Sequence, residues 1–333
     1  MGLQPVEFHI RILRVDLVPI LAFLASASAQ NLPRADAVRI REFYQLATEV
    51  QDKVWPRWNE IPAPLLLVTD KAEFLIHHPA PPKDFNKITE DIYIRPRQFP
   101  TNLLATFPAF GTPSVIVIGE PASTSSKTST AWLITVMHEH FHQLQNAQPG
   151  YFQAVEDLGL SHGDKTCMWM LNYPFPYDKP EVSRAFMGVR DLMLDALNEA
   201  NRDKFAQLAE EYIAQRKSFF AQLSPDDHKY LAFQLWQEGI ARYTQIKVAE
   251  SAAQYQPSPE YAALPDFESF GAHAFHARKD TLDELRKSDL SKSKREVVYA
   301  WGAAEGLLLD RRRPEWRDEY FSHPFSLDSY FEK

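Results

Sequence analysis

The chain has 333 residues, of which 45% are hydrophobic and 24% are charged, so it is long enough for one large core or two closely packed lobes. A formal net charge of -8, with no basic stripe to offset it, argues against nucleic acid as a partner. The single cysteine, Cys167, excludes an intrachain disulfide framework and is typical of a buried structural thiol.

The first 29 residues have the pattern of a signal peptide. Arg11 and Arg14 precede an apolar run over 17–25, and the Ala-Ser-Ala sequence at 27–29 matches an A-x-A cleavage site. The apolar run is too short to be a permanent membrane span. The sequence therefore predicts a signal peptide over 1–29 and a chain exported to the bacterial periplasm or secreted, with no stable membrane span after cleavage.

The part that follows is predicted to contain one helix and a small sheet. Apolar residues recur with helical spacing over 34–54, and a proline at 56 ends the pattern. Three short runs of apolar and β-branched residues, separated by proline-rich turns, predict strands at 64–69, 91–95 and 114–118. The last of these strands leads into the next helix, and its edge is available to pair with an extended peptide.

An HExxH motif lies in that next helix. Residues four apart share one helix face, so His138 and His142 can offer two imidazole nitrogens to one metal ion. Glu139 lies beside them, placed to act as a general base on a metal-bound water. Most neighbouring side chains are apolar, which favours a buried helix over a solvated surface helix. Buried ionisable groups need partners, and a metal ion is one such partner.

A catalytic zinc site needs a third protein ligand. The metzincin extension HExxHxxGxxH is excluded, because Gln145 and Gln148 stand where its glycine and third histidine belong. Glu156 follows the motif closely, but its context after Pro149-Gly150 is that of a loop.

Glu238 is the better candidate for the third ligand. It lies on a predicted helix over 226–252, which Ser224 caps, and it falls on the apolar stripe of that helix. A buried carboxylate needs a cation, which is either a metal ion or a paired arginine. Gly239 indicates that another element approaches closely at this point, and the HExxH helix is the expected element.

The two motifs together resemble the gluzincin zinc peptidases, and locally the aminopeptidase-N-like enzymes. Those enzymes place their zinc-binding glutamate in a setting similar to the WxxEGxAxY sequence found here at 236–243. The resemblance implies Zn²⁺ as cofactor, with His138, His142 and Glu238 as ligands and Glu139 as the general base.

The resemblance also implies a tyrosine that stabilises the oxyanion. Tyr299 falls at a comparable separation after the glutamate, and Tyr243 is the alternative. Two features depart from the aminopeptidase-N-like pattern: a long insertion separates the two motifs, and the segment 109–113 lacks the GxMEN-type sequence that grips a free amino end.

Further helical patterns at 180–198 and 202–223 complete the expected architecture. We expect an α+β fold with a mainly helical, zincin-like body and a small antiparallel or mixed sheet beside the HExxH helix. The expected division is an N-terminal α+β part over 30–129 and a helical zinc-site part over 130–333, packed as one catalytic unit.

The predicted function is that of an exported zinc metallopeptidase with a peptide or protein substrate. The alternative is a non-catalytic exported ligand-binding protein on a zincin scaffold, in which an aromatic loop over 169–177 captures the ligand. The intact Glu139 favours the enzyme, because a scaffold does not need a base.

Overall fold

The structure, a computed structural model, describes residues 31–164 and 166–332. The predicted signal peptide over 1–29 lies outside these residues and stays a prediction. Among the described helices, none combines the length and apolar character that a membrane span requires.

A six-stranded mixed sheet forms the N-terminal part, with strand order β3-β4-β2-β1-β6-β5. β1 and β6 pair in parallel, with Leu66 opposite Val117, and the other neighbouring strands are antiparallel. β3 and β5 are therefore the edge strands. The strands are β1 (Leu65–Val68), β2 (Ala72–Ile76), β3 (Asn86–Lys87), β4 (Ile92–Pro96), β5 (Leu104–Phe107) and β6 (Val115–Gly119).

Alternating side chains of the central strands enter two different cores. Leu65 and Leu67 of β1 face the helices and belong to the main core, whereas Leu66 and Val68 face a smaller cluster on the opposite side. This division follows from the two-residue period of a strand. The continuous apolar runs of β1 and β6 are thus explained, since both of their faces are covered.

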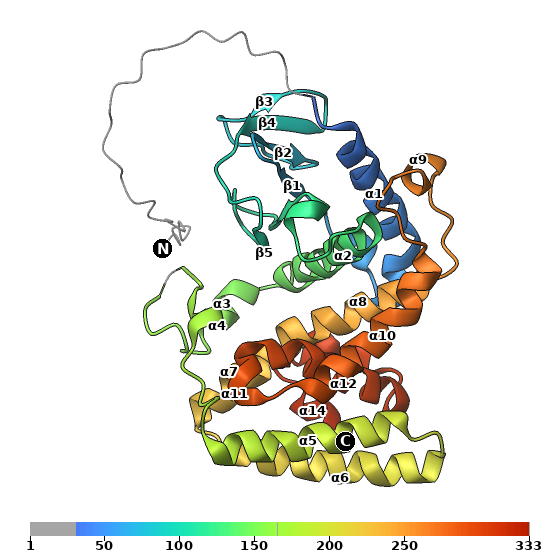
Figure 1. Cartoon of the computed structure of the whole chain (residues 1–333). Coiled ribbons are helices and arrows are strands. Elements are labelled where there is room, and N and C mark those ends of the chain that lie inside the picture. The colour runs from blue at the N-terminus through green and yellow to red at the C-terminus, as the bar shows by residue number, and fades with distance from the viewer. Residues whose placement is uncertain (1–30, 165, 333) are drawn as a thin grey trace.

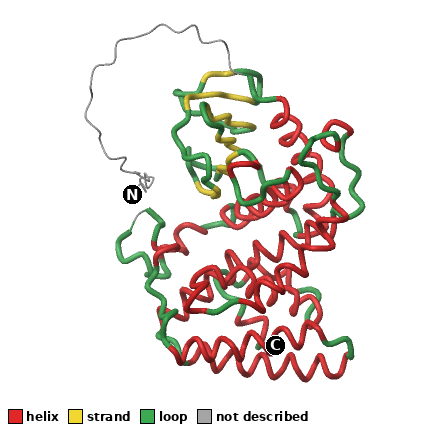
Figure 2. Tube along the Cα trace, viewed as in Figure 1, coloured by secondary structure: helices red, strands yellow, loops and turns green. Residues whose placement is uncertain are grey.

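Helices make up most of the remaining chain, and the strands gather at one end of the molecule (Figures 1 and 2). The HExxH helix α2 lies between the sheet and the helical body, in contact with β5, β6 and α8. The longer helices are α1 (Arg34–Val54), α2 (Ser129–Asn146), α5 (Pro180–Asn198), α6 (Arg202–Ala221), α7 (Pro225–Gln234), α8 (Ile240–Ser251), α10 (Phe270–Lys287) and α12 (Val297–Arg312). The short helices are α3 (Tyr151–Glu156), α4 (Trp169–Asn172), α9 (Pro259–Ala262), α11 (Leu290–Ser293), α13 (Trp316–Glu319) and α14 (Asp328–Phe331).

Five single-turn or irregular helical segments connect these elements. The 3-10 segments are η1 (Trp58–Glu60), η2 (Pro121–Ser123), η4 (Lys294–Glu296) and η5 (Tyr320–Ser322), and η3 (Leu235–Gly239) is a π-helix between α7 and α8.

The expected fold class, a mainly helical α+β protein with a mixed sheet beside the HExxH helix, is confirmed. The three predicted strands correspond to β1, β4 and β6, and the predicted helix over 34–54 is α1. The strand that provides the free sheet edge beside α2 differs from the expected one. β6 pairs on both sides, so β5 is the exposed edge next to α2.

Candidate metal centre

Helix α2 presents His138, Glu139 and His142 as a buried group that could hold a metal ion. Each side chain offers one ligand atom, and these atoms lie within 4.8 Å of one another. The Thr128 side chain caps the N-terminus of helix α2 by accepting from the Ala131 backbone N–H. Its apolar neighbours fill the core and bury the three polar side chains.

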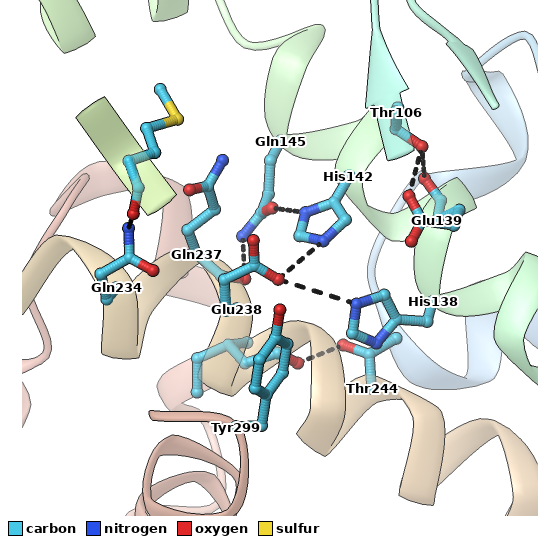
Figure 3. Close-up of polar contacts among 12 residues, drawn as sticks. Thr106, His138, Glu139, His142, Gln145, Gln234, Gln237, Glu238, Thr244 and Tyr299 are labelled. Atoms are coloured by element: carbon cyan, nitrogen blue, oxygen red, sulfur yellow. Dashed lines mark hydrogen bonds and ion pairs between the residues drawn. The ribbon is translucent and has the colours of Figure 1, made fainter. Parts of the chain in front are cut away.

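Glu238 approaches this group from a second helical element, the π-helix η3 (Figure 3). Its Oε2 atom lies 3.4 Å from His142 Nε2 and 3.9 Å from His138 Nε2. Both distances are short enough for one ion to contact the carboxylate and each imidazole. π-turns inside α-helices are found frequently at functional sites, and this one lies at the residue predicted to be the third ligand. The structure thus brings Glu238 to both imidazoles, while its role as a metal ligand remains a prediction.

Gly239 allows a close helix contact, but the partner differs from the expected one. A Cβ atom at Gly239 would lie 2.5 Å from the Cα atom of Gly302 on α12, so the two glycines meet backbone to backbone. The expectation that the HExxH helix makes this approach was wrong. The contact holds α12, and with it Tyr299, against the π-helix.

Gln145 connects the two ligand-bearing elements. Its Oε1 atom lies 2.7 Å from His142 Nδ1, and its Nε2 atom donates to the backbone carbonyls of Trp236 and Gln237. A carbonyl oxygen at Nδ1 requires the proton on that nitrogen, so Nε2 is the ring atom left to face Glu238. One side chain therefore fixes the imidazole tautomer and the position of the π-helix together.

Glu139 is held by β5. The Thr106 hydroxyl donates to Glu139 Oε2 at 2.8 Å, and the same hydroxyl lies 3.0 Å from the Glu139 backbone carbonyl (Figure 3). Burial raises the pKa of Glu139, against the lowering effects of His142 and Thr106. A carboxylate with a raised pKa, fixed beside a metal-binding group, is suited to accept and return a proton.

The charges of the group are strongly coupled. Burial lowers the pKa of His138 to about 3, so its ring is neutral and able to bind a metal. Burial also opposes charge on His142, but the Glu238 carboxylate outweighs it and raises the pKa of His142 to about 9. For Glu238, burial acts to raise the pKa, whereas His142 and Arg295 together hold it well below its usual range.

Arg295 supplies a second partner for Glu238. Its guanidinium lies 3.0 Å from Glu238 Oε1, the oxygen that does not face the imidazoles. The same guanidinium donates to the Tyr299 hydroxyl at 3.1 Å and to the Gln234 side chain at 2.9 Å. The structure therefore contains the ion pair that was the alternative to a metal, and it leaves Oε2 of Glu238 directed toward the histidines.

The two predicted tyrosines lie in different surroundings. Tyr299 lines the cavity beside the group, with its ring centroid 6.5 Å from that of His138. The Tyr243 hydroxyl donates to Asp310 at 2.7 Å, and its ring packs against Trp316 in the core. Glu156 is an exposed residue at the end of α3.

A cavity of about 720 Å³ opens onto the group. Its wall includes Leu104 and Thr106 of β5, with Met170 and Leu171 of the insertion on another side. Of the aromatic loop over 169–177, Trp169, Phe175 and Tyr177 are buried as core residues. The insertion therefore contributes Cys167, Met170 and Leu171 to the cavity wall, and not its aromatic side chains.

The donor set fits zinc. Ligand atoms at about 2.1 Å around a tetrahedral zinc lie about 3.4 Å apart. The distance from His142 Nε2 to Glu238 Oε2 matches this spacing, and the distance from His138 Nε2 is longer by half an ångström. Two imidazoles and one carboxylate are the protein ligands of several catalytic zinc sites, whose fourth position stays open for the reaction.

Sequence reasoning missed Gln145, Thr106 and Arg295. Gln145 had a local signal, since a residue three positions after His142 lies on the same helix face, yet it was treated only as a departure from another motif. Thr106 and Arg295 come from elements distant in the sequence, and the sequence contained no signal that would place them here.

Comparison with known protein families, with curated proteins and with solved structures finds no match to this chain. The site is therefore interpreted from its own geometry and chemistry.

Proposed function

We propose that this protein is a zinc-dependent hydrolase of the gluzincin type that cleaves peptide bonds. One observation supports it above all others: two imidazole nitrogens of α2 and one carboxylate oxygen of the π-helix face a common point at the end of a cavity. In this proposal His138, His142 and Glu238 hold Zn²⁺, which when bound would act as a Lewis acid and lower the pKa of a coordinated water.

Glu139 is the proposed general base. It accepts the proton of the attacking water and then donates it to the leaving amine. Thr106 holds one of its carboxylate oxygens, which restricts its rotation and keeps the other oxygen available. Tyr299 is the proposed oxyanion donor, since its hydroxyl accepts from Arg295 and keeps its own proton for a group in the cavity.

The edge strand β5 supports a peptide as substrate. Leu104, Ala105 and Thr106 line the cavity and belong to an edge strand, so their free backbone groups can pair with an extended chain. The sheet and the helical part both contribute to the site, which is consistent with one catalytic unit. The signal-peptide pattern adds the proposal that the enzyme is exported.

A second candidate is the non-catalytic ligand-binding protein. The ion pair between Arg295 and Glu238 favours it, because this arginine partly neutralises the carboxylate without a metal. In that case the cavity would bind its ligand with the Glu238 charge already compensated.

Metal analysis combined with hydrolysis separates the two candidates. We expect the purified chain to bind one equivalent of zinc and to cleave members of a peptide library. Glu139→Gln should retain the zinc and lose hydrolysis by about 10²- to 10⁴-fold, because it removes the base while preserving the shape of the side chain. Gln153→Glu on the exposed face of α3 provides a surface control with unchanged activity.

Zinc bound by the wild-type chain without cleavage of any peptide would favour the ligand-binding protein. Absence of zinc binding would contradict the hydrolase.

A further inference from the structure

Arg242 differs from the other charged groups that line the cavity wall. Glu238 pairs with Arg295, Glu139 accepts from Thr106, and Glu296 is exposed to solvent at the rim. For the partly buried Arg242, the described residues provide neither a hydrogen-bond acceptor nor a carboxylate within ion-pair distance, and its Nε atom is fully buried without a partner. Among the described residues, the ring of Tyr299 lies next to it, with the ring centroid 5.8 Å from the guanidinium carbon.

The position of Arg242 directs this charge toward the reaction site. It follows Glu238 by four residues, so both side chains lie on the same side of their helix. Its guanidinium carbon lies 5.8 Å from the centroid of the Tyr299 ring, and that centroid lies 6.5 Å from the centroid of the His138 ring. The guanidinium therefore lies next to the groups proposed to bind the metal and the oxyanion.

Gln237 is a second polar residue of the cavity with unused capacity. Its Nε2 atom donates to the Tyr151 hydroxyl at 3.0 Å, whereas its Oε1 atom is buried and has no donor among the described residues. Buried acceptors are nearly always paired with a donor, so this amide oxygen is an unsatisfied polar atom beside the cavity. The cavity thus offers one cation and one neutral acceptor that the described part of the chain leaves unsatisfied.

A partly buried guanidinium without an anion is unfavourable, and an arriving anion offsets that cost. The planar fork of arginine matches the two oxygens of a carboxylate, which makes paired, charge-assisted hydrogen bonds. A peptide supplies both missing groups, since it has N–H donors and ends in a carboxylate.

We infer that Arg242 binds a carboxylate of the substrate, so that this site selects peptides with a negative group close to the scissile bond. The inference rests on the proposed hydrolase function. The carboxylate could come from the C-terminus of the peptide or from an acidic side chain, and the test separates these two sources.

Binding to a non-hydrolysing background measures the preference directly. The probes for calorimetry with the zinc-loaded Glu139→Gln chain are N-acetyl tetra-alanine with a free carboxylate, the same peptide as its amide, and amides with one alanine replaced by aspartate or by asparagine. We expect a carboxylate to tighten binding about 10- to 100-fold over its neutral counterpart. A gain confined to the free terminus identifies the C-terminal carboxylate, and a gain for aspartate over asparagine identifies a side chain.

Substitution of Arg242 tests whether this residue causes the preference. Adding Arg242→Gln should remove the difference between the charged and neutral probes, with the binding of the neutral probes unchanged. Equal binding of charged and neutral probes by the parent chain, or a preference that survives the substitution, would overturn the inference.

Two further variants control for charge and for folding. Arg278→Gln removes an arginine from α10 that is 43% exposed and lies 4.0 Å from Glu250, and it should keep the full preference. Arg242→Lys keeps the charge but loses the fork, so the preference should fall about tenfold. If Arg242→Gln does not fold, an undiminished preference in Arg242→Lys contradicts the inference.

Hydrolysis by the wild-type chain distinguishes this inference from the proposed function. Cleavage of acid and amide peptides with equal kcat/KM would contradict the role of Arg242 and leave the hydrolase intact. Binding that depends on Arg242, without cleavage of any probe or library peptide, would contradict the hydrolase and leave the carboxylate site intact.

Discussion

Helix α2 has one hydrogen-bonded histidine–glutamine pair on each of two faces. On the cavity face, His142 Nδ1 lies 2.7 Å from Gln145 Oε1, and on the sheet face His140 Nδ1 lies 2.8 Å from Gln143 Oε1. Gln145 Nε2 also donates to backbone carbonyls of the π-helix. Gln143 Nε2 instead donates to backbone carbonyls at the start of β1 and β6. The His140 ring stacks on Trp58 at 5.1 Å and does not line the cavity.

The difference shows what distinguishes a candidate metal ligand from a core histidine. Both histidines are buried and both have a glutamine on Nδ1, so residue type, burial and the first partner do not separate them. The surroundings of the ring separate the two histidines. His142 Nε2 faces a carboxylate at the end of a cavity, whereas His140 is enclosed by aromatic rings. Burial lowers the pKa of His140 to about 4 and keeps its ring neutral.

After the loss of the base Glu139, the largest effect is expected at Tyr299. Tyr299→Phe removes the proposed oxyanion donor on the cavity side and should lower kcat by about 10²- to 10³-fold with zinc content unchanged. Tyr243→Phe is the matched control, because that hydroxyl donates to Asp310 in the core and should affect stability by about 1 kcal/mol without changing kcat. Steady-state kinetics on one peptide substrate compares them, and equal kcat values in both variants would exclude Tyr299 from catalysis.

The next effect is expected at the helix contact behind the site. Gly239→Ala would place a methyl group against Gly302, so the free energy of unfolding should fall by about 1–3 kcal/mol and zinc affinity should fall with it. Gly188→Ala on α5 is the control, since its nearest contact is a flexible glutamine side chain at 3.4 Å. Urea denaturation measures both variants. Unchanged stability of Gly239→Ala would mean that α12 can move without cost.

Substitution of Gln145 and Gln143 tests whether the two faces of α2 differ in zinc binding. Gln145→Leu removes the hydrogen bond that orients His142 and should weaken zinc binding about 10- to 100-fold. Gln143→Leu removes the equivalent bond on the sheet face and should lower stability by about 1–3 kcal/mol, leaving zinc affinity unchanged. Competition with a chromophoric chelator reports both affinities. Similar losses of zinc affinity in the two variants would show that the faces are not functionally distinct.

The smallest effect is expected at Glu120, next to the sheet. Burial and the hydrogen-bonded Asp36 carboxyl raise the pKa of Glu120 to about 7 from an ordinary value of 4.5. The folded protein therefore holds this proton more tightly than the unfolded chain, so its stabilising contribution is complete below pH 4.5 and is lost as the pH rises through 7. Glu120→Gln should match the wild type at low pH and be more stable above pH 7. Denaturation curves at pH 4.5 and pH 8 test this, and a difference independent of pH would contradict it.

Local patterns predicted the helices that have clear periodicity and clear ends. Helix α5 has the predicted bounds, and Ser224 caps α7 as expected, with Pro225 at the first helical position. Three strands were missed because their patterns are short or broken. In β2 the buried Glu73 interrupts an apolar run. Its ion pair with Arg95, at 2.7 Å, and the backbone N–H groups of Gln98 and Phe99 make a buried carboxylate possible there.

The residues of the candidate site that belong to the two sequence motifs were predictable. His138, Glu139 and His142 share one helix, and Glu238 was identified from its apolar stripe and its local resemblance. The π-turn that presents Glu238 has no sequence signature, since it replaces one hydrogen-bond pattern by another without a special residue. The groups that complete the site depend on tertiary packing, which sequence spacing does not determine.

Zinc coordination in the full chain tests the central claim most directly. X-ray absorption at the zinc edge, on protein loaded with one equivalent, should show two imidazole nitrogens at about 2.0–2.1 Å and a carboxylate oxygen at about 2.0–2.2 Å. Glu238→Gln should lose the carboxylate contribution and most of the affinity, while His140→Phe should keep the wild-type spectrum. A chain that binds no zinc, or a Glu238→Gln variant with the wild-type spectrum and affinity, would contradict the claim that two helical elements share one ion.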